Sequence, residues 1–240
     1  MASGEVVDHR SFLGGLEPAD RAFLLRLGHP KRFRKGARII VQGDHSDTVF
    51  LTLSGLVKVT LDTPDGREIV LAVLGAGDLL GEFEVIEGTP QRAAGNVAVL
   101  PVECRVIPAD EFMASLETHP QMLLVMVRVI ISRLRAADRR REASASMGVS
   151  RSLAGFLVEL LDRYGTSDGS VIDISIHLTQ EELASLMSTS RDSAVRGLST
   201  LRTKGLIATR RRQIVVTDLG GLRRYASAMA TAHDSGWPTP

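Results

Sequence analysis

The segment from Leu178 to Ile207 (LTQEELASLMSTSRDSAVRGLSTLRTKGLI) constrains the fold more than any other part of the chain, because it predicts two helices joined by a tight turn. Thr179 is a suitable N-cap residue for the first helix, and Glu182 three residues later completes a capping box. Apolar residues then recur at helical spacing, namely Leu183, Leu186 and Met187. We therefore expect this segment to fold as a helix-turn-helix.

The second predicted helix follows a polar break at residues 188–190. The front of this helix carries Arg191, Asp192 and Arg196, which are two long donors and an acceptor. In the major groove of DNA, arginine can bind guanine through two hydrogen bonds, and a carboxylate can accept from cytosine. A capped helix pair with a polar face also occurs in many proteins of other kinds, so the pair alone leaves DNA binding open. The apolar positions of the second helix are Ala194, Leu198 and Leu201.

The residues after the helix pair strengthen the interpretation as a DNA-binding unit. Gly205 is expected to end the second helix, and residues 207–217 (IATRRRQIVVT) predict a hairpin with Arg210, Arg211 and Arg212 at its tip. Such a hairpin is the wing of a winged helix, where cationic side chains can reach phosphates. Residues 174–224 hold nine Lys or Arg and four Asp or Glu, a net charge of +5 in a chain whose total is +1. This local positive charge is typical of a surface that binds phosphates.

Length and composition indicate an ordinary globular protein with room for two domains. The chain has 240 residues, of which 44% are hydrophobic and 24% charged. Its single cysteine, Cys104, cannot form an internal disulfide, which fits a reducing compartment. The N-terminus has no signal-peptide core, and the most apolar run, residues 122–131, is too short to span a bilayer. We expect a cytoplasmic protein with no membrane partner.

Short apolar segments separated by turn signals dominate residues 37–108. Strands of this length at nearly even spacing predict a small antiparallel β-barrel or roll. The predicted strands are Arg38–Val41, Val49–Leu53, Leu56–Leu61, Glu68–Leu74, Asn96–Leu100 and Cys104–Ile107.

A long helix is predicted from residue 118 to about residue 142, with Pro120 near its start. Its heptad-like spacing favours a paired helix, and the expected partner is the same helix of a second subunit. A second apolar face, formed by Leu124, Val129 and Ile131, is expected to pack against the roll. The residues of the predicted dimer seam are Leu123, Val127, Ile130, Leu134 and Ala137.

The pattern divides the chain into four parts. Residues 1–117 are expected to form the β-roll domain, 118–143 the dimerisation helix, 144–227 the winged helix-turn-helix domain and 228–240 a flexible tail. Residues 144–150 are small and predict a hinge, and Val149–Tyr164 predicts one more amphipathic helix. The inward positions of that helix are Leu153, Phe156, Leu157, Leu160 and Leu161. The fold class is therefore α+β.

This order of parts resembles the Crp/Fnr family of bacterial transcription regulators, and the resemblance covers roughly residues 12–225. Gly43–Asp47 with the following Phe50–Val59 resembles the family's first roll signature. Asp65–Glu68 and Leu74–Glu82 resemble its central turns, and Ser190–Ser193 the start of its recognition helix. The resemblance implies a cyclic-nucleotide-binding β-roll, a long dimerisation helix and a C-terminal winged helix-turn-helix.

In the family's cyclic-nucleotide-binding members, a Gly-Glu pair lies ten residues before an arginine, with a short helix between them. Gly81 and Glu82 stand at this spacing before Arg92, which is followed by Ala93 and Ala94. Glu82 would accept from a ribose hydroxyl, and Arg92 would bind the cyclic phosphate beside backbone amides at Gly81 and Ala93–Ala94. Alternatively, Glu82 and Arg92 pair with each other as a structural relic. Ala93 also departs from the Ser or Thr that commonly donates to the phosphate.

Two residues of the long helix bear on the identity of the effector. In the resemblance, Ala137 and Asp138 stand where two hydroxyl residues contact adenine, so cyclic-AMP specificity does not carry over. Asp138 could accept from guanine, which makes cyclic GMP a second candidate, or it could pair in solvent with Arg135 or Arg141. No obligatory cofactor is expected, and cyclic AMP or cyclic GMP is the candidate effector. An effector-independent regulator, or one with another small ligand, also fits these departures.

By the same resemblance, Arg191 reads guanine, Asp192 replaces a glutamate that accepts from cytosine, and Arg196 supports another base. The expected partners are double-stranded DNA, a second copy of the chain and RNA polymerase. A nucleotide-binding module whose winged helix contacts protein instead is the alternative. An enzyme or a metal site is not expected, because the six histidines are scattered along the chain. The residues expected to hold phosphates are Ser190, Ser193, Arg210, Arg211 and Arg212, and Thr179 is a further expected DNA-binding residue.

Overall fold

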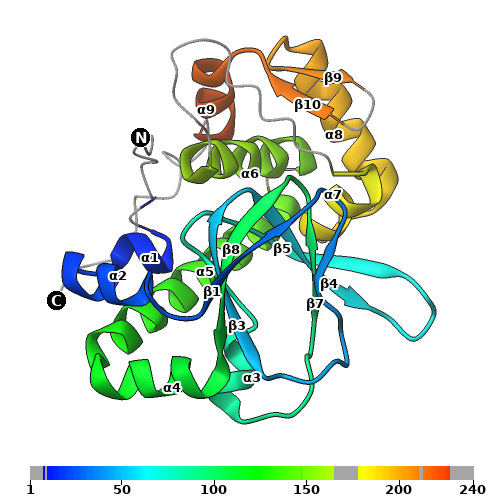
Figure 1. Cartoon of the computed structure of the whole chain (residues 1–240). Helices are drawn as coiled ribbons and strands as arrows, with labels where there is room; N and C mark the ends of the chain where they lie inside the picture. Colours follow the sequence, from blue (N-terminus) through cyan, green and yellow to red (C-terminus); the bar gives the residue numbers. More distant parts are fainter. Residues whose placement is uncertain (1–7, 9, 147, 165–177, 211–212, 228–240) are drawn as a thin grey trace, which may run out of the picture. The chain divides into compact units, whose positions relative to one another are not determined.

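The computed structural model (Figure 1) describes residues 8, 10–146, 148–164, 178–210 and 213–227. The chain forms two compact units, residues 1–136 and 137–240. The first unit contains α1 (Phe12–Gly15), α2 (Pro18–Leu24), β1 (His29–Phe33), β2 (Arg38–Ile40), β3 (Thr48–Ser54), β4 (Leu56–Asp62), β5 (Glu68–Gly75), β6 (Leu79–Leu80), α3 (Glu82–Glu87), β7 (Gly95–Ala98), β8 (Val102–Pro108), α4 (Ala109–Thr118) and most of α5 (Pro120–Ser146). The second contains α6 (Val149–Tyr164), α7 (Gln180–Leu186), α8 (Arg191–Thr203), β9 (Ile207–Arg210), β10 (Gln213–Val216) and α9 (Leu219–Ser227).

The first unit is an antiparallel β-roll, which confirms the sequence prediction. Two four-stranded sheets have the strand orders β1-β8-β3-β6 and β2-β7-β4-β5, and every pairing is antiparallel. Apolar side chains from both sheets form one buried cluster, among them Phe50, Val57 and Cys104. A second cluster joins the sheet β1-β8-β3-β6 to the flanking helices and includes Phe12, Phe112 and Met122.

Two strands of the roll were not predicted, and each lacks the usual sequence signal. β1 is an edge strand that contains Pro30, and it is almost wholly exposed, so it shows no alternation of apolar and polar residues. β6 is only two residues long. Each pairs only with a strand distant in sequence, which a local pattern does not reveal.

Helix α5 follows Pro120 as predicted but ends at Ser146 rather than near residue 142. The predicted assignment of its faces was partly wrong. Val129 is buried, whereas Leu124 and Ile131 are exposed beside the predicted seam. The buried side of α5 is formed by Met122, Val125, Met126 and Val129, which belong to the cluster that joins the sheet β1-β8-β3-β6 to the helices. The exposed apolar stripe consists of Leu123, Leu124, Val127, Ile130, Ile131 and Leu134.

The second unit has the expected winged helix-turn-helix. Helix α6 has the predicted bounds and buries the five inward positions that the sequence predicts. The predicted hinge at 144–150 is shortened, because 144–146 belong to α5 and α6 begins at Val149. Helix α9 was not predicted. The strands β9 and β10 pair as a hairpin, with Gln213 opposite Arg210, while Arg211 and Arg212 lie outside the described residues, as does the predicted tail at 228–240.

The end of α8 is set by Gly205, as the sequence predicts. Gly205 has a φ of 71°, in the left-handed region that favours glycine. Its N–H donates to the carbonyl of Arg202, and the N–H of Leu206 donates to that of Leu201 at 3.0 Å. These two bonds define a Schellman motif, which satisfies the last carbonyls of the helix and directs the chain into the wing.

Candidate effector cassette and DNA-facing surface

Gly81 begins the candidate effector cassette in a conformation that other residues adopt only with strain. It caps α3 with a φ of 74°, and its carbonyl accepts a hydrogen bond of 2.7 Å from Nη1 of Arg92. A Cβ at this position would lie 2.4 Å from the same Nη1 atom. Glycine is therefore required for Arg92 to approach the beginning of α3.

Glu82 is buried at the first position of α3 and pairs with an arginine from α5. Its Oε1 lies 3.3 Å from Nη1 of Arg133, while Nη2 of the same guanidinium lies 3.0 Å from Oδ1 of the buried Asp78. Burial raises the pKa of Glu82 from 4.5 to about 7, although Arg133 opposes this effect; the charges of Asp78 and Glu84 add to it. Burial thus favours the protonated, uncharged form of Glu82 relative to an exposed carboxyl.

Arg92 is buried, and its guanidinium is held by main-chain carbonyls and one carboxylate. Besides the carbonyl of Gly81, Arg92 donates through Nη2 to the carbonyl of Thr48 and, at 3.3 Å, to Oγ1 of the same residue. Oε2 of Glu84 lies 3.7 Å from Nη1. Burial lowers the pKa of Arg92, and the charge of Glu84 is the largest opposing influence.

The alternative pairing of Glu82 with Arg92 is not observed. Glu82 pairs with Arg133, and Arg92 pairs with Glu84. The backbone N–H of Ala93, expected to form part of an anion-binding nest, donates to Oε1 of Glu84 at 3.1 Å. Sequence reasoning missed both new partners, because neither the position of Arg133 on α5 nor the inward orientation of Glu84 leaves a local signal.

The two residues considered for base recognition both lie on α5. Asp138 pairs with Arg141 one turn along the helix, at 3.3 Å, and both side chains are largely exposed. This is one of the two solvent pairings that the sequence allows. Base recognition by Ala137 or Asp138 stays a prediction. Ala94 is half-buried before β7 and likewise has only a predicted role.

The first helix of the helix-turn-helix is capped by Thr179 as the sequence predicts, and the second helix is also capped. Oγ1 of Thr179 accepts from the N–H of Glu182 at 3.2 Å, and the carboxylate of Glu182 accepts from the N–H of Thr179. Ser190 caps α8 by accepting from the N–H of Ser193. Between the helices, Ser188 adopts a φ of 49°, the only positive φ of a non-glycine residue in the described part of the chain. The Ser190 cap fixes the front of α8, where the predicted base contacts lie.

The arginines at the front of α8 are exposed and only loosely held. Nε of Arg191 lies 2.8 Å from Oε1 of Glu181, a pair in which both side chains are more than half exposed. Nη2 of Arg196 donates to Oγ of Ser193 at 2.8 Å. Asp192 is exposed in the first turn. Because exposed ion pairs contribute little, about 1 kcal/mol or less, these side chains can readily exchange their partners for a ligand.

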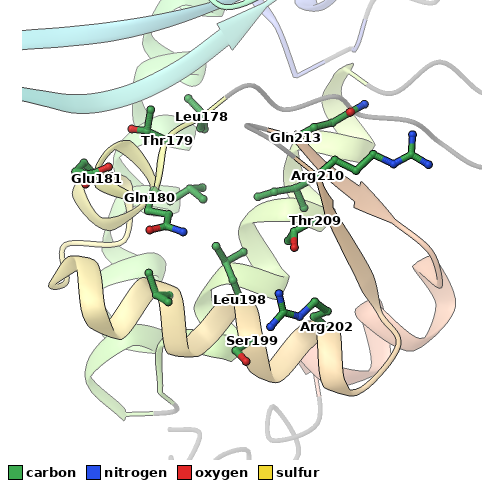
Figure 2. Close-up of a pocket in the computed structure, with 13 residues that line it drawn as sticks. Leu178, Thr179, Gln180, Glu181, Leu198, Ser199, Arg202, Thr209, Arg210 and Gln213 are labelled. Carbon is green, nitrogen blue, oxygen red and sulfur yellow. The ribbon is translucent and has the colours of Figure 1, made fainter.

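A groove of about 490 Å³ lies beside α8 (Figure 2). Its walls come from the start of α7, from α8 and from the hairpin, and they include Thr179, Arg202 and Arg210. Of these, Thr179 and Arg210 were predicted to bind DNA, and Arg202 was not. Hydroxyl and guanidinium donors around one groove are suited to phosphate oxygens.

The described residues contain neither a cluster of three or more potential metal ligands nor a helix that is long and apolar enough to cross a membrane. Cys104 is buried in β8, and burial raises the pKa of its thiol to about 11. This supports its interpretation as a core residue.

The two units match two family models. Residues 30–119 match the cyclic nucleotide-binding domain, and residues 151–225 match the Crp-like helix-turn-helix domain, so that more than half of the chain is covered. A β-roll that matches a cyclic nucleotide-binding domain, followed by a winged helix-turn-helix, defines the class of DNA-binding regulators with a nucleotide-binding-type domain. The chain belongs to the Crp/Fnr family of transcription regulators.

Individual relatives agree with this family. The chain is 27% identical over 222 residues to the CRP-like cAMP-activated global transcriptional regulator of Mycobacterium tuberculosis, covering 92% of this chain and 99% of that protein. It is 28% identical to the cyclic AMP receptor protein of Thermus thermophilus, covering 90% and 96%. A solved CRP-family transcriptional regulator from the same organism is 27% identical, with a TM-score of 0.65 and coverage of 82% and 96%. These relatives are transcription regulators, not enzymes.

Proposed function

We propose that the protein is a homodimeric regulator that binds a palindromic DNA site and is controlled by a cyclic nucleotide, cyclic AMP or cyclic GMP, in the β-roll. In this proposal residues 1–117 sense the effector, 118–143 form the dimer and 144–227 bind DNA. RNA polymerase is the proposed further partner. The observation that carries the proposal is the exposed arginine pair at the capped front of α8, Arg191 and Arg196.

The DNA-binding part is tested with Arg191→Ala and a duplex selected by the wild-type protein from a random pool. We expect a loss of about 1–3 kcal/mol on that duplex and a flattened preference at one base pair. Arg224→Ala, on an exposed position of α9, is the matched control and should leave sequence preference unchanged. Fluorescence anisotropy at several salt concentrations measures both the affinity for the selected duplex and the preference for it over random DNA. Equal losses on selected and random DNA would contradict the role of Arg191 in reading bases.

The dimer is supported by the apolar stripe of α5. Its side chains are 37% to 59% exposed, although they are large and apolar, and they recur at spacings of three and four residues. A second copy of the helix would cover such a stripe. Leu134→Glu should therefore produce monomers in sedimentation velocity. Leu71→Glu adds the same charge at an exposed leucine of β5 and should leave the association state unchanged. A wild-type monomer would refute this part.

The effector is tested by isothermal titration with cyclic AMP and then cyclic GMP. Arg92→Gln should weaken binding of either nucleotide, because it removes the charge that faces the phosphate. Effector-independent DNA binding is the second candidate, and one observation favours it: the donors of Arg92 and Ala93 already have partners in the folded chain. Equal DNA affinity with and without nucleotide would favour that second function. If the winged helix contacts protein rather than DNA, the anisotropy of a labelled duplex should show no salt-dependent change on addition of the protein.

A further inference from the structure

Glu84 lies where the effector cassette would hold an anion. It is on α3, two residues after Glu82, and its side chain is only 11% exposed. One carboxylate oxygen accepts from the N–H of Ala93 at 3.1 Å, and the other lies 3.7 Å from Nη1 of Arg92. Both donors are among those that the resemblance assigns to the cyclic phosphate.

We propose that Glu84 is an internal substitute for the phosphate of the effector, and that a cyclic nucleotide binds only by displacing the Glu84 carboxylate from Arg92 and Ala93. The inference rests on the proposed effector function of the cassette and names the residue that sets its affinity. Carboxylate and phosphate are both anions that accept charge-assisted hydrogen bonds from guanidinium and backbone N–H groups. Two such anions repel each other when they are buried side by side, so the site holds one of them at a time.

The remaining contacts of Arg92 explain why the phosphate must replace Glu84 rather than bind beside it. The guanidinium is 3% exposed, and its other bonds go to the carbonyls of Gly81 and Thr48 and to Oγ1 of Thr48. These neutral acceptors belong to the frame of the roll. Ala93 supplies no hydroxyl with which a phosphate could gain an extra bond. Because Glu84 is part of the same chain, its high effective concentration lowers the apparent affinity of any dissolved anion.

The displaced carboxylate has a second position available. Glu84 also lines a surface hollow of about 360 Å³, together with His45 and Ser46. Oγ of Ser46 is buried and has no hydrogen-bond partner among the residues that the structure describes. A hydroxyl donor without an acceptor is costly in a folded protein, and a carboxylate that turns into the hollow would satisfy it. In this proposal the Glu84 carboxylate therefore has two alternative positions, one beside Arg92 and one in the hollow beside the hydroxyl of Ser46.

The test is isothermal titration of the full-length protein with cyclic AMP and cyclic GMP. Glu84→Gln keeps the shape of the side chain and removes its charge, and Glu84→Ala removes the carboxamide as well. We expect both variants to bind the preferred nucleotide at least about tenfold more tightly than the wild type, a difference of about 1.4 kcal/mol. Glu87→Gln removes the same charge from an exposed position of the same helix and should change affinity less than about twofold. A cooperative thermal unfolding transition checks that each variant is folded.

The possible results distinguish the role of Glu84 from the proposed binding of a cyclic nucleotide by the cassette. If the wild type binds nucleotide and both Glu84 variants bind equally or more weakly, the cassette is an effector site and Glu84 is not the substitute anion. If wild type and both variants bind neither nucleotide, the effector function fails and the inference fails with it. Ser46→Ala tests the second position: it should weaken binding in the wild type and have no effect beside Glu84→Ala. Equal losses in both backgrounds would refute that position.

Discussion

Replacement of Glu82 by glutamine is expected to stabilise the protein at neutral and alkaline pH and to have little effect in acid. Burial raises the pKa of Glu82 from 4.5 to about 7, and Arg133 offsets only part of this rise. Between these two values the folded protein keeps a proton that the unfolded chain has released. The stability associated with Glu82 is therefore fully present below pH 4.5 and is lost as pH rises toward about 7. Glutamine resembles the protonated carboxyl and does not titrate, so the variant avoids this loss.

The expected magnitude follows from the size of the pKa change. A rise from 4.5 to about 7 corresponds to about 3 kcal/mol, at about 1.4 kcal/mol for each pH unit. The difference in free energy of unfolding between variant and wild type should grow from near zero in acid to about 3 kcal/mol near pH 8. Arg133 is not left without a charged partner, because Asp78 lies 3.0 Å from its Nη2 atom.

Urea unfolding of both proteins at a series of pH values measures this difference. Subtraction of the two curves removes the contributions of groups that do not interact with Glu82. Glu87→Gln, which removes a carboxyl from an exposed position of the same helix, is the control for loss of a carboxylate outside the buried site. If the wild type instead gained stability relative to Glu82→Gln as pH rose, attraction by Arg133 would outweigh the cost of burial, and the reasoning would be wrong.

Three further outcomes are expected from single positions. Ser188→Gly should stabilise the protein by about 0.5–1 kcal/mol, because relief of a left-handed φ of 49° outweighs the chain entropy of glycine; a loss in urea unfolding would show that the serine side chain stabilises the turn. Phe112→Ala should cost about 3–5 kcal/mol in the same assay, since Phe112 is 0% exposed, and a cost below about 1 kcal/mol would contradict its place in the core. Cys104 should react with a maleimide only after denaturation, because burial raises its pKa to about 11; rapid labelling of the native protein would refute this.

The elements that could be predicted from sequence are those whose signals are local. The bounds of α6, the capping box at Thr179 and the helix end at Gly205 follow from side-chain spacing and caps within a few residues. The longer strands of the roll follow from short apolar segments that are bounded by turn residues. The end of α5 was misjudged because residues 143–146 are small and permit either a helix or a hinge.

The cassette could be only half predicted. Gly81, Glu82 and Arg92 stand at a recognisable spacing, but their partners come from elsewhere. Arg133 reaches Glu82 from a helix 51 residues away, and the orientation of Glu84 depends on the loop that brings Ala93 to it. Spacing identifies groups that can meet a ligand, whereas the fold decides which of them already have partners.

The two ion pairs of the cassette differ in what an effector must replace. A phosphate competes with Glu84, which lies on the same short helix as Glu82, so the Glu84–Arg92 pair sets affinity. A hydroxyl that bonds to Glu82 competes with Arg133, which lies on α5 between Ile130 and Leu134 of the exposed apolar stripe. The Glu82–Arg133 pair therefore connects ligand contact to the helix proposed as the dimer interface. Effector affinity and the coupling of the effector site to α5 thus depend on different residues. Variants of Glu84 should alter the affinity and leave the coupling through Glu82 and Arg133 unchanged.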